Sequence, residues 1–219
     1  MKLLIFVTLL TIFSSGLASA AIVAGQYFDR IVTVIFENQD YSKAIEDTYL
    51  KSLYKSSQGL LLTSYDAAKN YVAMIYGSTD GATDDGDFNL PGQNLVDLLE
   101  AKSITWKAYM ENYSTSMRWF QGWFDSRKDD PKFNMNTLFF FVWDKAATSG
   151  SNKVAAVLYG IPVSPPPNKE DPTAYNHYSF LASVEQNWNL GNLGRNDATA
   201  TPFNKYLVRP ASVSASVTY

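Results

Sequence analysis

Four side chains that could bind a divalent cation lie directly after apolar runs or at the start of a helical pattern in this sequence. Glu37 and Asn38 come directly after one long apolar run, Asp144 directly follows a second, and His177, the only histidine of the chain, opens a helical pattern. In open α/β sheets the working groups collect beyond the carboxyl ends of the strands. Carboxylate, amide and imidazole donors suit a divalent cation. The shared position predicts one metal site, with these members: Glu37, Asn38, Asp144 and His177.

Each of these residues also has an interpretation without a metal. Capping of the following helix would explain Glu37 and Asn38, and an ordinary turn would explain Asp144. A lone histidine near a helix start often serves as a structural hydrogen-bonding group. A glycosidase using Glu37 and Asp144 would require their carboxyl groups to lie roughly 5 to 9 Å apart. It is their common location that favours the metal site.

Other chemical motifs are weak. The segment GSTDG at 77–81 is not G-x-S-x-G, because its central residue is Thr79, which disfavours a serine-hydrolase elbow. The acidic stretch 80–87 lacks the EF-hand spacing. Trp119 and Trp123 recur at helical spacing, which is typical of core residues. No glycine-rich phosphate loop with its lysine occurs in the sequence.

Composition excludes several classes of protein. Lys and Arg number 18 against 21 Asp and Glu, a formal net charge of −3, so a nucleic-acid partner bound through a basic face is not expected. The chain is 46% hydrophobic and 15% aromatic, and it has no cysteine. It therefore has enough apolar surface to form a packed core, and it must fold without disulfides.

The N-terminus has the pattern of a secretory signal peptide. Lys2 precedes the largely apolar run 3–13, and Ala18-Ser19-Ala20 forms a small-residue cleavage site. The run is shorter than the ~20 residues that a membrane span needs, so no stable membrane anchor is expected. We predict a signal peptide at 1–20 and a secreted single domain at 21–219, with an irregular tail from about 191. The sequon at Asn112 predicts a glycosylation site.

Strand and helix patterns alternate along the domain, which predicts an α/β fold with a mainly parallel sheet. Residues 70–76 fit either a short helix or a strand, and residues 162–172 form a Pro-rich loop. Asn94 is the expected N-cap of the helix at 95–101. The expected strands are 30–36, 60–65, 105–110, 138–143 and 153–159. The expected helices are 41–57, 95–101, 116–127 and 176–188.

Five segments, in the same order along the chain, resemble the secreted phosphoesterase family. The resemblance extends from about residue 28 to residue 203. That family contains fungal-type acid phosphatases and bacterial phosphatidylcholine-hydrolysing phospholipases C, and it belongs to the alkaline phosphatase superfamily. The segments are IFENQDY at 35–41, YGSTDG at 76–81, NMNTLFFFVWD at 134–144, YNHYS at 175–179 and LGNLGRND at 190–197.

The resemblance implies an alkaline-phosphatase-like α/β/α sandwich that hydrolyses phosphate esters beside one or two divalent metal ions. The implied substrate is a phosphomonoester or a phospholipid head group. Glu37 with Asn38 matches the first metal-binding block of the family. Asp144 matches the aspartate after the late core strand, and His177 matches the late metal-binding histidine. The resemblance does not specify which divalent metal is bound.

The chain departs from the family at functional positions. The usual His-Pro-Ser-x-Pro-Asn-Tyr segment, which supplies the nucleophile, is shortened here to YDAAKNY at 65–71, and a ligand-bearing segment after Asn112 is missing. Lys145 stands where an acidic residue is expected. Two hypotheses follow: a secreted acid phosphatase that uses another hydroxyl, such as Ser64 or Ser78, or a non-catalytic secreted protein that keeps the fold and a residual ion or phosphate site.

Overall fold

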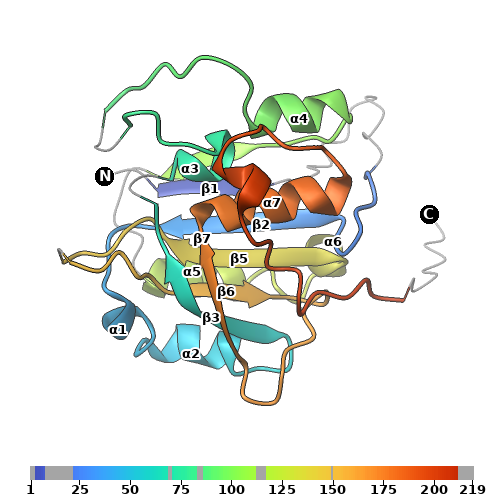
Figure 1. Ribbon diagram of the computed structural model, residues 1–219. Helices are drawn as coiled ribbons and strands as arrows, with labels where there is room; N and C mark the ends of the chain where they lie inside the picture. The colour runs from blue at the N-terminus through green and yellow to red at the C-terminus, as the bar shows by residue number, and fades with distance from the viewer. Residues whose placement is uncertain are drawn as a thin grey trace.

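The computed structural model describes residues 3–7, 22–68, 71–82, 86–111, 117–148 and 150–211. Its described strands form one sheet in the order β4-β1-β2-β5-β6-β3-β7 (Figure 1). The strands are β1 (Leu3–Val7), β2 (Arg30–Phe36), β3 (Gly59–Asp66), β4 (Ala108–Glu111), β5 (Thr137–Trp143), β6 (Ala156–Tyr159) and β7 (Glu170–Asn176). The helices are α1 (Tyr41–Ala44), α2 (Thr48–Tyr54), α3 (Ala73–Tyr76), α4 (Leu95–Ala101), α5 (Met117–Asp125), α6 (Pro131–Asn134), α7 (His177–Trp188) and the 3-10 helix η1 (Asn196–Thr199).

The sheet is mixed, which corrects the expectation of a mainly parallel one. β2 pairs with β5 in parallel, and β3 pairs with β7 in parallel, but β6 lies between β5 and β3 and is antiparallel to both. A connection without a helix joins β5 to β6, and such a connection returns the chain beside the strand that it has just left. β2, β5, β3 and β7 still run in one direction, so their carboxyl ends share one edge of the sheet, the carboxyl edge.

Helices cover both faces of this sheet, which confirms the α/β class. All residues of β2 and of β5 are buried, as their continuous apolar runs predict. On β5, Phe139 and Phe141 pack against Phe124 of α5, with ring centroids 5.0 and 5.2 Å apart. The intervening Phe140 packs against Phe180 of α7 at 5.4 Å. Because side chains alternate across a strand, α5 and α7 lie on opposite faces, and Figure 1 shows α7 crossing in front of the sheet.

Local capping chemistry explains where several helices begin. α7 begins at His177 as predicted, with Asn176 in a capping box, and Asn94 caps α4 in the same way. The single helix expected over 41–57 is wrong, because the Asp47 side chain accepts a hydrogen bond from Leu50 and starts a new helix, α2. Residues 73–76 form a helix, α3.

Strand β7 was not expected from the sequence, which shows only a Pro-rich loop before it. β7 contains Pro172 and lies at the edge of the sheet. Proline lacks an N–H group, and it is tolerated in an edge strand because one side of that strand has no partner. Because of this proline, the sequence pattern did not predict β7, the strand that places His177 at the carboxyl edge.

The predicted signal peptide overlaps β1. β1 lies between β4 and β2, antiparallel to both, with Ile5 opposite Val34. The signal peptide stays a prediction, and cleavage after Ala20 would remove β1 from the sheet. The sequon residue Asn112 lies outside the described residues. Among the helices that the structure describes, none has both the length and the apolar character needed to cross a bilayer.

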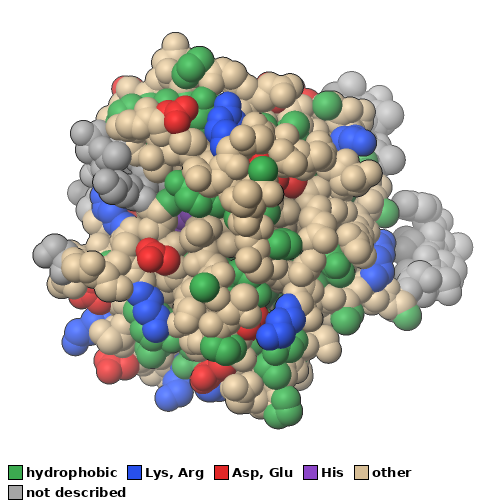
Figure 2. Space-filling view, viewed as in Figure 1, with side chains coloured by type: hydrophobic (Ala, Val, Ile, Leu, Met, Phe, Trp, Pro, Cys, Tyr) green, Lys and Arg blue, Asp and Glu red, His purple; other side chains and the backbone are tan. Residues whose placement is uncertain are grey.

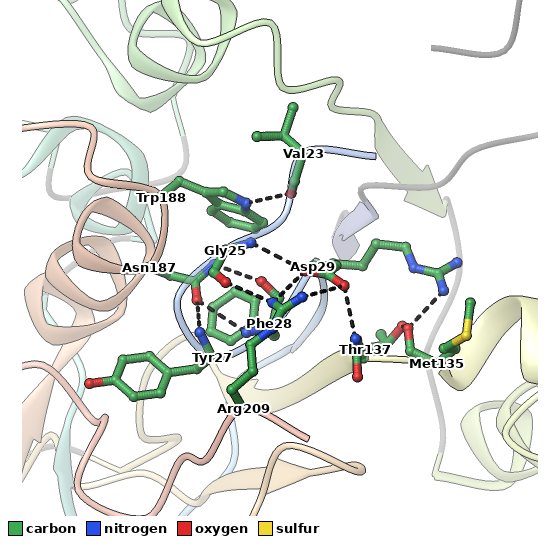
Figure 3. Close-up of polar contacts among 12 residues, drawn as sticks. Val23, Gly25, Tyr27, Phe28, Asp29, Met135, Thr137, Asn187, Trp188 and Arg209 are labelled. Carbon is green, nitrogen blue, oxygen red and sulfur yellow. Dashed lines mark hydrogen bonds and ion pairs between the residues drawn. The ribbon is translucent and has the colours of Figure 1, made fainter. Parts of the chain in front are cut away.

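Segment 22–29 is clasped by the end of α7 (Figure 3). Asn187 accepts hydrogen bonds from the main-chain N–H groups of Tyr27 at 2.9 Å and Phe28 at 3.2 Å, and it donates to the Phe28 carbonyl at 2.9 Å. The indole of Trp188 donates to the carbonyl of Val23 at 3.0 Å. A Cβ on Gly25 would lie 2.0 Å from the Asn187 amide nitrogen, so this close approach requires glycine.

Candidate functional site

The carboxyl ends of β2 and β5 place Glu37 and Asp144 at the same level of the sheet. Phe36 and Trp143 are register partners whose rings stack at 4.6 Å, and the main-chain N–H of Asp144 donates to the carbonyl of Phe36 at 2.9 Å. Glu37 and Asp144 therefore leave the two strands at the same level, and both are half-buried. The expectation that these two strand ends meet at one edge is met by the parallel β2–β5 pair.

The side chain of Asn38 faces the carboxylate of Asp144. With its amide nitrogen turned to Asp144, Asn38 donates hydrogen bonds of 2.9 Å to Oδ1 and 3.1 Å to Oδ2. Oδ1 of Asp144 also accepts from the main-chain N–H of Lys145 at 2.7 Å. The orientation of a carboxamide is assigned from its hydrogen-bond partners, and these distances bring the polar groups of the two strand ends into direct contact.

His177 is fully buried beside this pair. Its Nε2 lies 3.0 Å from the main-chain carbonyl of Asp144, and its Nδ1 lies 3.2 Å from the hydroxyl of Tyr65. A carbonyl oxygen only accepts, so Nε2 carries the proton, and Nδ1 accepts from Tyr65. Burial lowers the pKa of His177 to about 4, so the ring is neutral over most of the pH range. Burial also raises the pKa of the Tyr65 hydroxyl, which stays protonated and donates.

These contacts occupy both ring nitrogens of His177. Nε2 of His177 touches the main-chain carbonyl of Asp144, and Tyr65 lies at the other ring nitrogen. Within the described ranges, no group of three or more His, Asp or Glu side chains converges as a set of metal ligands. The structure therefore brings Asn38, Asp144 and His177 together, with Glu37 adjacent, but it gives His177 a structural position.

The sequence provided no signal for Tyr65 or for Asn152. Tyr65 is an inward-facing aromatic residue of β3, and its hydroxyl acquires a role only when α7 lies beside it. Asn152 accepts from the N–H of Ala146 at 3.1 Å and donates to the carbonyl of Ala67. It thereby ties the β5–β6 connection to the end of β3, on the edge that carries Asp144.

A second link joins the same connection to the turn after β2. Oδ1 of Asp40 accepts hydrogen bonds from the N–H and the hydroxyl of Thr148, each at 2.9 Å. The N–H donor of Thr148, followed by its hydroxyl, holds the pKa of Asp40 below its ordinary value. Lys153 places its ammonium 4.0 Å from the ring centre of Tyr41 in the same region. These contacts hold the β5–β6 connection, which follows Asp144, against the segment that follows β2.

In the described part of the chain, no hydrogen bond joins either of the two hydroxyls considered as substitute nucleophiles to Asn38, Asp144 or His177. Ser64 is an exposed residue of β3, opposite Ala174 of β7. Ser78 follows α3 and donates a hydrogen bond of 2.6 Å to Asp80. Neither hydroxyl is a partner of His177, because Tyr65 and Asp144 fill both ring nitrogens.

Acidic and basic side chains are interspersed over the face of the molecule shown in Figure 2, and no field of one sign covers that face. This distribution agrees with the small net charge of −3. It gives no basic surface of the kind that binds nucleic acid on the face in view.

The fold and the strand-end cluster define an α/β protein with a polar site at one edge of its sheet, and the chain is similar to fungal acid phosphatases. The chain is 27% identical to a probable acid phosphatase of Kluyveromyces lactis, over 81% of this chain and 62% of that protein. It is 26% identical to an acid phosphatase of Aspergillus fumigatus, over 81% and 59%, and 24% identical to a phosphate-repressible acid phosphatase of Penicillium chrysogenum, over 81% and 63%.

The chain is shorter than these relatives. It spans about three fifths of the length of the first two. The match to the Kluyveromyces protein extends over 265 residues, more than the 219 residues of the whole chain, so that protein has insertions relative to this one within the matched region. No protein-family model matches the chain, and no solved structure matches it.

Proposed function

We propose that this protein is a secreted phosphate ester hydrolase of the acid phosphatase type, in the alkaline phosphatase superfamily, whose site is the Asn38–Asp144 cluster with Glu37. The observation that carries the proposal is the contact of Asn38 with Asp144. These residues come from separate segments of the chain, both of which resemble phosphoesterase blocks, and the similarity to acid phosphatases supports the same assignment. The substrate class is a phosphomonoester or a phospholipid head group.

The donor atoms of this cluster suit a divalent cation. If the Asn38 amide turns its oxygen toward Asp144, an oxygen faces the two carboxylate oxygens at 2.9 and 3.1 Å. Such an arrangement repels unless a cation lies between the groups, and Glu37 is the adjacent carboxylate. Oxygen donors favour hard cations such as Mg²⁺ or Ca²⁺. A bound cation would polarise the phosphoryl oxygens of the substrate.

His177 contributes to this site as a positioning residue in the proposal. Its hydrogen bond to the Asp144 carbonyl holds the main chain of the residue whose carboxylate faces Asn38. The ring is neutral and fully buried, so it adds no charge that would repel a cation. Glu37, Asn38 and Asp144 would hold the metal without it.

A second candidate function is a non-catalytic protein that retains an ion or phosphate site. Two observations favour it: the ring nitrogens of His177 are both occupied, and Lys145 follows Asp144. The segment that resembles the nucleophile-bearing block of the family is shortened here to YDAAKNY at 65–71. Turnover would then depend on another hydroxyl, and a displaced nucleophile loses most of the advantage of proximity.

Hydrolysis of p-nitrophenyl phosphate from acidic to neutral pH, with added Mg²⁺ or Ca²⁺ and with a chelator, tests both candidates. Chelator-sensitive turnover that is lost in Glu37→Gln and kept in the exposed control Glu46→Gln would support the phosphatase. Absent turnover together with cation or phosphate binding by calorimetry would support the non-catalytic protein. Absence of turnover and of both kinds of binding would overturn both.

A further inference from the structure

Two carboxyl groups are buried against each other on the α7 face of the sheet. Glu185 lies on α7 and Asp197 lies on η1, and each is 3% exposed. The carboxylate of Asp197 accepts from the main-chain N–H of Leu193 at 2.7 Å through Oδ2 and from that of Arg195 at 3.0 Å through Oδ1. Asp197 thus holds the segment 190–197 in a turn through hydrogen bonds to the main chain of that segment.

A hydrogen bond joins the side chains of Glu185 and Asp197. Two ionised carboxylates are both acceptors, so this bond requires a proton on one of them. Two N–H donors stabilise the charge on Asp197, whereas Oε1 of Glu185 is buried without a hydrogen-bond partner. An unpartnered oxygen is far less costly to bury in a neutral acid than in a carboxylate. The proton therefore belongs on Glu185.

We propose that Glu185 and Asp197 share one proton and form a pH-sensitive latch that holds segment 190–197 against α7 and the end of α3. The latch is closed in acidic solution, and it weakens as the pH rises and the shared proton is lost.

The latch holds more than its own segment. Asn196 donates to the carbonyl of Gly77 from its main-chain N–H at 3.0 Å and from its amide at 2.9 Å. Gly77 has a φ of 74°, and a Cβ there would lie 2.4 Å from Oδ1 of Asp197. Only glycine fits this turn, so the end of α3 is built against Asp197. Loss of the Glu185–Asp197 bond would loosen η1 and α3 together.

The groups around Glu185 favour its protonated form. Burial, then the charge of Asp197 and the hydrogen bond to it, raise the pKa of Glu185 to about 8, and they outweigh the main-chain N–H of Leu193, which lowers it. The nearest cation on η1's side, Arg195, turns its guanidinium to the carbonyls of Tyr76 and Gln93 and lies 3.8 Å from the Tyr76 ring centre. It is therefore committed to α3 and to the segment before α4 rather than to Glu185.

Among the described residues, the charged group that acts on the pKa of Glu185 is Asp197, and other groups packed on α7 have partners of their own. On β7, Asp171 is occupied by hydrogen bonds from Thr173 and Tyr175 and by the ammonium of Lys205 at 3.7 Å. On β5, the contact with α7 is made by Phe140. Asp197 is thus the charged group that adds to burial in keeping Glu185 protonated.

The direction of the pH effect follows from proton linkage. Between the ordinary pKa of a glutamate, 4.5, and about 8, the folded protein keeps a proton that the unfolded chain releases. The contribution of Glu185 to stability is therefore greatest at the acidic end of this window and falls as the pH rises through it. Below about pH 6.5 the buried neutral His177 has the opposite effect, because the unfolded chain binds a proton that the folded protein does not. One proton changes the folded-to-unfolded ratio by about tenfold for each pH unit. Above about pH 8 the stabilising effect of this proton is lost completely.

Urea unfolding of wild type and Glu185→Gln between pH 6.5 and 8.5 tests the latch. The single histidine titrates near pH 6.5 in the unfolded chain of both proteins, so its effect cancels when the two are compared at the same pH. We expect the wild-type folded-to-unfolded ratio to fall up to about tenfold over the unit from pH 6.5 to 7.5. Glu185→Gln, whose amide donates to Asp197 at every pH, should lose this slope. The exposed control Glu46→Gln should keep it. An equal slope in wild type and Glu185→Gln would overturn the proposal.

A second measurement does not depend on a variant that folds. The side-chain carboxyl carbon of Glu185 in the native protein, followed by carbon NMR, should titrate with a midpoint well above 6. A midpoint near the ordinary value of a glutamate would show that Glu185 is ionised at neutral pH, and it would overturn the latch whatever the unfolding data show.

Discussion

The first residue of α7 is tied to the residue that follows β5, because Nε2 of His177 donates to the main-chain carbonyl of Asp144 at 3.0 Å. Tyr65, at the end of β3, holds the opposite ring nitrogen. One buried imidazole therefore joins three elements at the edge where the proposed site lies. The role of His177 as a metal ligand stays a prediction from the sequence, and the structure adds these two hydrogen bonds to it.

Replacement of His177 by alanine should lower stability whether or not a metal is present. The change leaves a buried Tyr65 hydroxyl and the Asp144 carbonyl without partners and opens a cavity, so we expect a loss of about 2–4 kcal/mol in the free energy of unfolding. Tyr65→Phe should cost about 1–2 kcal/mol, because one buried acceptor is left unpaired. Urea unfolding with and without a chelator measures both. A loss for His177→Ala that disappears in the chelator would instead assign the residue to a metal.

Asp144→Asn should weaken cation binding at the carboxyl edge by at least about tenfold, because it removes the carboxylate that faces Asn38. Calorimetric titration with Mg²⁺ and Ca²⁺ measures the effect. Asp129→Asn is the matched control, since the Asp129 side chain is 86% exposed and pairs with Lys128 at the surface. Binding that is unchanged in Asp144→Asn would remove this residue from the site.

Asn187→Ala should open the clasp on segment 22–29. It removes the acceptor of the Tyr27 and Phe28 N–H groups and the donor to the Phe28 carbonyl. Loss of these contacts at a site that is 2% exposed should cost about 2–4 kcal/mol. Thermal or urea unfolding checks this, with the exposed Asn168→Ala as control. An unchanged midpoint would mean that the clasp does not contribute to folding.

Removal of residues 1–20 should promote association. β1 is the neighbour of β2 opposite β5, so its loss uncovers the hydrogen-bonding edge of a strand whose residues are all buried. Bare strand edges pair with other chains. We expect the mass from light scattering to rise with concentration for a chain that begins at Ala21. A monomer at every concentration would indicate that β4 moves to cover β2.

The sequence pattern predicted correctly those strands and helix starts that depend on residues close together in the chain. The apolar runs at 30–36 and 138–143 became the two fully buried strands, because a strand covered on both faces needs apolar residues at every position. Asn176 and Asn94 cap helices through bonds to residues two or three positions away. The same local reasoning missed β7, whose proline is acceptable only because the strand lies at an edge.

The sequence by itself determined the α/β class and the position of Glu37, Asn38 and Asp144 at strand ends. Tertiary structure alone decided the mixed order of the sheet and the partners of His177. Tyr65 and His177 are 112 residues apart, and their contact depends on which strands become neighbours. The proton shared by Glu185 and Asp197 has the same origin, because a carboxyl group retains its proton only where folding removes water and brings a second carboxylate within reach.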